Sequence, residues 1–214
     1  SSFTLLIAPP AWGKTHLLLN LFQSSHSRWI FISPLRALAN EFSIKCQKII
    51  PTLLIQRRGD SQKSITFFLT KKKALLITTP ELLQSDLLPF FSTSKEKAIF
   101  IYDEFHLFYY WGESFRVKMW DTFMQTAISG HSHLALTATV SKDIELKMDH
   151  DIALNFEKQC WINLGNQTLK NKPVKIHYHL EFFQGLLISD FDWQIRKKKG
   201  TLLFFCQFRS QVKK

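Results

Sequence analysis

Short, mostly apolar runs recur along the chain, and apolar residues at helical spacing follow the first of them. The runs are Phe3–Ile7, Trp29–Ile32, Ala74–Thr78, Ala98–Tyr102 and His133–Leu136. Runs without polar alternation are typical of parallel strands that are covered on both faces. After the first run, Leu17, Leu18, Leu21 and Phe22 recur at helical spacing, which predicts a helix over Thr15–Gln23. The pattern predicts an α/β fold, a mostly parallel sheet with helices on both faces.

The turn between the first run and its helix reads A-P-P-A-W-G-K-T, Ala8–Thr15. A loop that ends in G-K-T between a strand and a helix presents backbone N–H groups and a lysine to a polyphosphate. Lys14 would neutralise phosphate oxygens, Thr15 would bind Mg²⁺, and Gly13 would let the backbone approach the ligand. The residues expected to bind the cofactors ATP and Mg²⁺ are Pro10, Ala11, Trp12, Gly13, Lys14 and Thr15. Ala8 replaces the first glycine of the general pattern, so weaker nucleotide binding, or a loop that binds nothing, is the alternative.

Two acidic residues, Asp103 and Glu104, follow directly after the run Ala98–Tyr102. Open α/β sheets bind ligands at the carboxyl ends of their strands, which is the edge that the Ala8–Thr15 loop also occupies. Asp103 is therefore predicted to hold Mg²⁺, directly or through water, and Glu104 to orient and deprotonate the attacking water. A solvated strand end would explain the acidic pair alone, but its combination with Lys14 favours a catalytic site.

Two other strand ends carry a hydroxyl residue followed by proline, Ser33-Pro34 and Thr79-Pro80. Ser and Thr cap helices and proline suits the first helical position, so a helix is predicted to start at each. The free N–H groups of such helix starts suit the phosphates of a polynucleotide. A further strand ends in Thr137-Ala138-Thr139, whose two hydroxyls are expected to relay the state of the nucleotide.

The order of these motifs resembles that of superfamily 2 helicases of the DExH type. The motifs are Gly13–Thr15 (G-K-T), Ser33–Leu35 (S-P-L), Thr79–Glu81 (T-P-E), Asp103–His106 (D-E-F-H) and Thr137–Thr139 (T-A-T). The resemblance implies a P-loop NTPase domain of the RecA-like type that drives an ATP-dependent helicase or translocase. It further implies that His106, Thr137 and Thr139 couple the nucleotide to the nucleic-acid face. Residues expected to contact nucleic acid there are Ser33, Pro34, Arg36, Thr79 and Pro80.

Within that superfamily the chain is most similar to RecQ helicases, because the segment W-G-x-x-F-R, Trp111–Arg116, follows the D-E-F-H motif. In that family this loop senses single-stranded DNA and couples it to ATP hydrolysis. Trp111, Phe115 and Arg116 are therefore expected to contact nucleic acid by base stacking and phosphate contact. The neighbouring aromatic residues Phe108–Tyr110 fit either an extension of this loop or a buried cluster.

The chain has 214 residues, enough for one α/β domain and part of a second. We expect a RecA-like domain over residues 1–164, a polar linker over 165–173 and the start of a second RecA-like domain over 174–214. In helicases of this superfamily the second domain supplies arginine fingers for hydrolysis. The chain is therefore expected to be a fragment that hydrolyses ATP slowly, whereas the intact protein would be the motor.

The net charge of +11, from 28 Lys and Arg against 17 Asp and Glu, favours a polyanionic partner. The expected partner is single-stranded or partly duplex nucleic acid, with DNA favoured over RNA. The three cysteines are widely spaced and indicate neither a disulfide framework nor a zinc site, so a reducing cytoplasm is expected. No apolar stretch reaches the length of a membrane span, so no membrane partner is expected, and the oligomeric state is not indicated.

Two other functions fit the same sequence. One is a catalytically weak nucleic-acid-binding module descended from a helicase, which the unusual residues Ala11 and Trp12 favour. The other is a P-loop enzyme that acts on a small molecule, such as a kinase. Such an enzyme would not need the segments Ser33–Leu35, Thr79–Glu81 and Trp111–Arg116.

Overall fold

The computed structural model describes residues 1–59, 61–93 and 97–165. Every helix and strand reported below belongs to one of two compact units of the chain, Ser1–Leu169. The predicted linker after Gly165 and the predicted start of a second domain over 174–214 lie outside the described residues. Those domain boundaries stay predictions.

A seven-stranded parallel sheet forms the centre of the domain, with the strand order β3-β4-β2-β5-β6-β1-β7. The strands are β1 (Ser2–Ile7), β2 (Arg28–Ile32), β3 (Thr52–Leu54), β4 (Ala74–Thr78), β5 (Ile99–Tyr102), β6 (Ser132–Thr137) and β7 (Lys158–Asn163). In register, Ile32 pairs with Tyr102 and Thr78, while Ile7 pairs with Thr137. Tyr102 also pairs with Ala135, two residues before Thr137, so the carboxyl ends of these strands lie near one another at one edge of the sheet. The predicted α/β RecA-like fold is confirmed.

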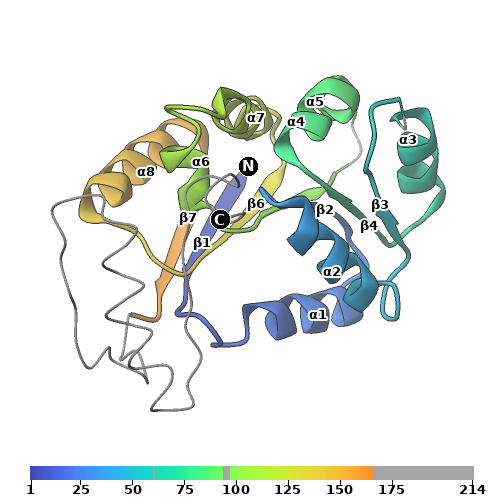
Figure 1. Ribbon diagram of the computed structural model, residues 1–214, viewed down its shortest axis with the longest axis horizontal. Coiled ribbons are helices and arrows are strands. Elements are labelled where there is room, and N and C mark those ends of the chain that lie inside the picture. Colours follow the sequence, from blue (N-terminus) through green and yellow to red (C-terminus); the bar gives the residue numbers. More distant parts are fainter. Residues whose placement is uncertain (60, 94–96, 166–214) are drawn as a thin grey trace, which may run out of the picture. The chain divides into compact units, whose positions relative to one another are not determined.

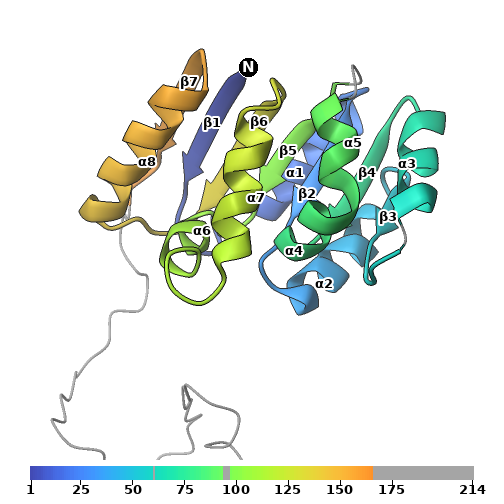
Figure 2. The ribbon, with the colours of Figure 1, turned by 90° about the horizontal axis from the view of Figure 1, so that it is seen from above.

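Helices cover both faces of the sheet (Figures 1 and 2). They are α1 (Lys14–Ser24), α2 (Arg36–Cys46), α3 (Ser61–Thr70), α4 (Pro80–Leu82), the π-helical turn η1 (Leu83–Leu87), α5 (Leu88–Thr93), α6 (His106–Tyr110), α7 (Val117–Ala127) and α8 (Lys142–Asn155). Helices α1 and α2 lie on one face, and the helices from α3 to α8 lie on the other (Figure 2).

The two faces are packed by alternate residues of the same strands, because successive side chains of a strand point to opposite sides. In β1, Leu5 and Ile7 belong to the cluster under α4 to α8, whereas Leu6 belongs to the cluster under α1 and α2. Phe31 of β2 stacks on Phe42 of α2 with ring centroids 4.1 Å apart. Burial on both faces explains why the central strands read as continuous apolar runs.

Three details differ from the sequence-based expectations. Helix α2 begins at Arg36 rather than at Pro34, because the Ser33 hydroxyl bonds across to the backbone carbonyl of Leu35 and the chain turns once more. Helix α4 does begin at Pro80 behind Thr79, but the Thr79 hydroxyl makes no capping hydrogen bond among the described residues. Strands β3 and β7 were not predicted, since β3 has only three residues and β7 is largely exposed at the sheet edge.

No helix in the described ranges is both long enough and apolar enough to cross a membrane.

A small polar network is buried inside the core. His133 of β6 stacks against the rings of Tyr102 and Phe100, and its Nδ1 atom lies 3.2 Å from the Tyr102 hydroxyl. The Tyr102 hydroxyl also hydrogen-bonds with Thr126 of α7. Burial lowers the pKa of His133 to about 3, so the imidazole is neutral in the folded chain.

The low pKa of His133 predicts acid sensitivity. Its folded pKa is below its ordinary value of 6.5, so the unfolded chain binds more protons, and stability is lost as the pH falls below about 6.5. In urea unfolding, the free energy of wild type relative to His133→Phe should fall by about 2 kcal/mol between pH 7 and pH 5. A constant difference between the two proteins over this range would contradict the assignment.

Candidate functional site

The motif residues lie at the carboxyl edge of the sheet, where backbone hydrogen bonds extend the ladder beyond the strands. The Ala8 N–H donates to the Thr137 carbonyl at 3.0 Å, and the Phe105 N–H donates to the Leu136 carbonyl at 2.9 Å. Strand β6 lies between β1 and β5, so both loops are attached to the same central strand. This attachment brings the Ala8–Thr15 loop and the Asp103-Glu104 turn together.

The predicted catalytic residues Lys14, Asp103 and Glu104 line one cavity of about 170 Å³, together with Thr15. The predicted Mg²⁺ ligands Thr15 and Asp103 thus also share it. The other lining residues are Leu18, Phe31, Leu38, Glu41, Phe42, Lys45 and Leu136. Sequence analysis missed the residues from α2, because they belong to no motif. The one feature of the sequence that could have indicated a helix here is the Glu41/Lys45 pair at i, i+4 spacing, which forms a 2.6 Å ion pair.

In the phosphate loop, Ala8–Thr15, the lysine side chain is bound by backbone carbonyls of the same loop. The Lys14 ammonium donates to the carbonyls of Ala8 at 2.8 Å and Pro9 at 3.3 Å. Gly13 has a φ of 105°, which suits glycine, but Ala11 has a φ of 60°, a left-handed conformation that is strained for alanine. Pro10, Ala11 and Trp12 are exposed, and 47% of the Trp12 surface is accessible. A polyphosphate would have to replace the contacts between Lys14 and the two carbonyls.

The Asp103 carboxyl is in an unfavourable electrostatic environment. Burial and the adjacent Glu104 carboxylate raise its pKa to about 6, against smaller opposing effects of a backbone hydrogen bond and the Lys14 ammonium. Glu104 itself has a φ of 45°, so the strand tip turns through a left-handed residue. Two close carboxylates beside a threonine hydroxyl fit a hard divalent cation, which would offset the repulsion between their charges.

No group of three or more His, Cys, Asp or Glu side chains in the described ranges could hold a metal ion by itself. A cation at Asp103 would therefore need oxygen ligands from Thr15, from water or from a phosphate. This is the usual arrangement for Mg²⁺, which binds through one or two protein oxygens together with phosphates and waters. The residues present therefore fit Mg²⁺ bound with a nucleotide.

His106 connects this cavity to β6. Its Nδ1 atom lies 2.8 Å from the Thr137 hydroxyl, whose single proton is donated to the Thr139 carbonyl at 3.1 Å. The Thr137 oxygen must therefore accept from His106, which fixes the proton of the neutral imidazole on Nδ1. Burial lowers the pKa of His106, against the opposing effect of Glu104, whose Oε2 lies 3.5 Å from Nδ1. The structure thus brings together His106 and Thr137, while Thr139 contributes its backbone carbonyl.

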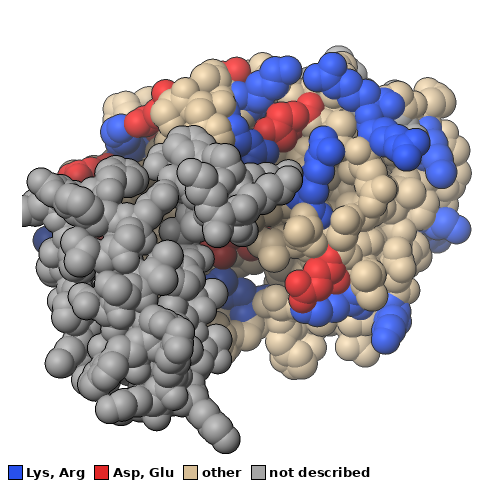
Figure 3. Space-filling view, in the orientation of Figure 1, with Lys and Arg blue, Asp and Glu red and all other residues tan. Residues whose placement is uncertain are grey.

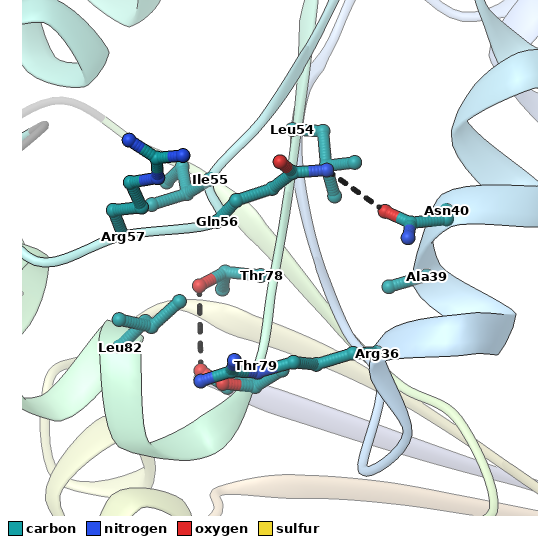
Figure 4. Close-up of a pocket in the computed structure, with 10 residues that line it drawn as sticks. All are labelled: Arg36, Ala39, Asn40, Leu54, Ile55, Gln56, Arg57, Thr78, Thr79 and Leu82. Carbon is teal, nitrogen blue, oxygen red and sulfur yellow. Dashed lines mark hydrogen bonds between the residues drawn. The ribbon is translucent and has the colours of Figure 1, made fainter.

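A second cavity of about 340 Å³ lies between α2, the end of β3 and the end of β4 (Figure 4). Its lining residues are Arg36, Ala39, Asn40, Leu54, Ile55, Gln56, Arg57, Thr78, Thr79 and Leu82. Arg36 reaches from α2 across the pocket towards Thr79. The Gln56 amide donates to the Asn40 side chain at 3.0 Å. This cavity combines two of the predicted nucleic-acid contacts, Arg36 and Thr79, with polar residues of the loop after β3.

Basic side chains surround this part of the domain. Figure 3 shows Lys and Arg side chains gathered around α3, with acidic and basic side chains side by side over α2. Arg36, Arg57 and Arg58 are all exposed there. Such a surface attracts phosphate groups at moderate salt.

The aromatic segment after the D-E-F-H motif divides between core and surface. Phe108 and Tyr109 are fully buried, whereas Tyr110 and Phe115 are exposed, Phe115 by 67%. Trp111 is partly buried and its ring centroid lies 5.5 Å from that of Phe115. Of the two alternatives for Phe108–Tyr110, Phe108 and Tyr109 therefore belong to a buried cluster, whereas Tyr110 lies at the surface.

Gly112 is required for the turn of this loop by close packing rather than by its φ angle. A Cβ atom there would lie 2.1 Å from the Phe108 carbonyl oxygen and 2.8 Å from the Trp120 Cβ. Both obstacles are held by α6 and α7, so a larger residue would displace the loop.

The four remaining predicted contacts, Ser33, Pro34, Pro80 and Arg116, are engaged inside the protein. Arg116 donates two hydrogen bonds to Glu81 and one to the Pro34 carbonyl. Ser33, Pro34 and Pro80 are buried. Sequence analysis missed Glu81 as a partner, although it is the last residue of the T-P-E motif. The predicted direct contacts of Ser33, Pro34, Pro80 and Arg116 with nucleic acid stay predictions.

The neighbouring strand ends, the G-K-T loop and the paired carboxylates define an ATP-binding domain of the RecA-like class. A family model of the DEAD/DEAH box helicases matches residues 3–146, more than half of the chain. The chain therefore belongs to the DEAD/DEAH box helicase family.

A solved structure with the same fold is the DEAD-box helicase Mss116 bound to ssRNA and UDP-BeF. It has a TM-score of 0.53 and 16% sequence identity, and the match covers 78% of this chain but 37% of that helicase. No curated protein sequence matches the chain. The chain thus spans well under half the length of its structural neighbour.

The raised pKa of Asp103 predicts that this residue destabilises the domain. Its pKa is about 6 in the folded chain against 3.8 normally, so the folded state binds more protons between these values, and stability falls as the pH rises through this window. Asp103→Asn should raise the free energy of unfolding at pH 8 by roughly 1–3 kcal/mol and by little at pH 4.

Chemical denaturation at the two pH values measures this difference. The exposed carboxylate Asp149 provides a matched control, since Asp149→Asn should change stability by less than about 0.5 kcal/mol. Destabilisation of Asp103→Asn at pH 8 would show that the carboxylate is compensated in the folded chain.

Proposed function

We propose that this domain binds ATP with Mg²⁺ and couples hydrolysis to single-stranded nucleic acid, as the first motor domain of an ATP-dependent helicase or translocase. The observation that carries the proposal is the grouping of Lys14, Thr15, Asp103 and Glu104 around one cavity. Membership in the DEAD/DEAH box family supports ATP hydrolysis as the general activity. It also argues against a small-molecule P-loop enzyme.

Each residue of the cavity has a distinct role in this proposal. Lys14 moves from the Ala8 and Pro9 carbonyls to phosphate oxygens, and Gly13 leaves room for the approaching phosphate chain. Mg²⁺ would be held by Thr15 and Asp103, and would supply charge neutralisation on the phosphates. Glu104 accepts a proton from the attacking water. His106 reports the state of this cavity through its hydrogen bond to Thr137.

The nucleic-acid strand would follow the adjacent edge of the sheet. Arg36 and Arg57 at the second cavity supply phosphate contacts, and the exposed Phe115 supplies a ring on which a base can stack. Trp111 lies deeper and supports Phe115 from below the surface of the loop. The strand therefore lies beside the segments that follow β2, β3, β4 and β5.

DNA is the proposed strand, because the Trp111–Arg116 loop has the W-G-x-x-F-R pattern of RecQ helicases. The competing possibility is RNA, since the DEAD-box neighbour is bound to ssRNA. The two strands differ at the 2′-hydroxyl, so a direct comparison of matched sequences distinguishes them.

A weak, non-hydrolysing nucleic-acid-binding module is the second candidate function. Two observations favour it, the strained φ of Ala11 and the closed state of the loop around Lys14. Both make nucleotide binding less favourable than in a glycine-rich loop.

An ATPase assay of the full-length protein tests the proposal. Single-stranded DNA should stimulate wild-type hydrolysis, and Lys14→Ala and Glu104→Gln should each reduce the stimulated rate by about a hundredfold or more. Glu104→Gln should retain ATP affinity, because only the accepting carboxylate is lost. Phe115→Ala should raise the DNA concentration needed for half-maximal stimulation by about tenfold.

Three results separate the alternatives. Stimulation of ATP hydrolysis by RNA but not by DNA of the same sequence would show that the strand is RNA rather than DNA. Binding of nucleic acid without any turnover would favour the inert module. Turnover that is independent of any strand would contradict the coupled motor.

A further inference from the structure

Arg116 connects three consecutive strand ends in the sheet order β4-β2-β5. Its Nε and Nη2 atoms donate to one carboxylate oxygen of Glu81, at 2.9 and 2.6 Å, and its Nη1 atom donates to the Pro34 carbonyl at 2.8 Å. Glu81 follows β4, Pro34 follows β2, and Arg116 ends the loop that follows β5 and α6. One guanidinium thus ties the aromatic loop to the two segments proposed to face the nucleic acid.

The same guanidinium lies over the Trp111 ring, 5.5 Å from its centroid. The side chains of Arg116 and Glu81 are only 21% and 32% exposed, so solvent screens their interaction less than at an open surface. Three N–H donors of Arg116 are therefore in use on protein acceptors. An arginine held at three positions orients the groups around it, and two of its five N–H donors remain for other partners.

We infer that Glu81 is a positioning residue, which holds Arg116 and thereby fixes the Trp111–Arg116 loop against the segments after β2 and β4. The inference rests on the proposed function and adds to it how the strand-sensing loop is kept in place. Through α6, this loop is also continuous with His106 and the nucleotide cavity. Loss of the contact would uncouple the two sites.

Other contacts also hold this part of the domain. Helix α7 also packs against α4, where the buried Thr122 hydroxyl lies 3.1 Å from the Pro80 carbonyl oxygen. Within the loop, the N–H groups of Ser114, Phe115 and Arg116 all donate to the Trp111 carbonyl. Those three amides report directly whether the loop is closed.

The loop also contains a matched control. Glu113 pairs with Lys147 of α8 at 2.6 Å, the same distance as the shorter Arg116–Glu81 contact, but with side chains 57% and 54% exposed. Such an open pair contributes little. Glu113→Gln removes one carboxylate from the same loop without touching Arg116.

The test combines amide hydrogen exchange with nucleic-acid-stimulated ATPase in the full-length protein. Glu81→Gln and Arg116→Gln should each raise exchange of the Ser114, Phe115 and Arg116 segment by about tenfold, the factor expected for lost hydrogen bonds to a charged group. Each should raise the DNA concentration for half-maximal stimulation by a similar factor. The double variant should be no worse than Arg116→Gln alone, because Arg116→Gln already removes the contact with Glu81. Glu113→Gln should match wild type in both measurements.

Opposite effects would overturn the inference. If Glu81 merely competed with phosphate for Arg116, Glu81→Gln would lower the DNA concentration for half-maximal stimulation while Arg116→Gln would raise it. Unchanged exchange in Glu81→Gln would also overturn it. Absence of DNA stimulation in wild type would instead contradict the proposed function, and the exchange data would still decide whether Glu81 holds the loop.

Discussion

The parallel register of β5 and β1 on the shared strand β6 is the constraint on which the rest of the domain depends. Strand β6 accepts main-chain hydrogen bonds from both neighbours just beyond their strand ends, at the Leu136 and Thr137 carbonyls. These contacts are made by the backbone, so the relative position of the Lys14 loop and the Asp103-Glu104 turn does not depend on their side chains. Side chains then decide what the preformed edge can bind.

The residues at this edge of the sheet lower the stability of the folded domain in a form suited to ligand binding. Asp103 and Glu104 place like charges together, and Glu104 and Ala11 adopt left-handed backbone conformations. The large apolar layers on both faces of the sheet supply the stability that tolerates this strain. The Asp103 and Glu104 carboxylates repel each other, and the Lys14 ammonium has no anionic partner among the described residues at this edge. A cation bound with a polyphosphate would neutralise both sets of charges.

The sequence predicted the parts of the structure that repeat a simple rule. Continuous apolar runs located β1, β2, β4, β5 and β6, and the G-K-T and D-E motifs placed the cavity residues at the same sheet edge. The exposed edge strand β7 lacks that pattern, so nothing marked it. The start of α2 was wrong because a local turn at Ser33 competes with the helix. Contacts between distant segments, such as Arg116 with Glu81, depend on the order of strands in the sheet, which the sequence pattern leaves open.

The exposed indole of Trp12 gives the phosphate loop an intrinsic fluorophore. It sits two residues before Lys14, on a loop whose shape is held by the contacts of that ammonium with the Ala8 and Pro9 carbonyls. Trp29, by contrast, is only 4% exposed and senses the core beneath α1 and α2. The chain has six tryptophans, so the part of the emission that a Trp12→Phe variant loses is the part that follows the surroundings of this loop.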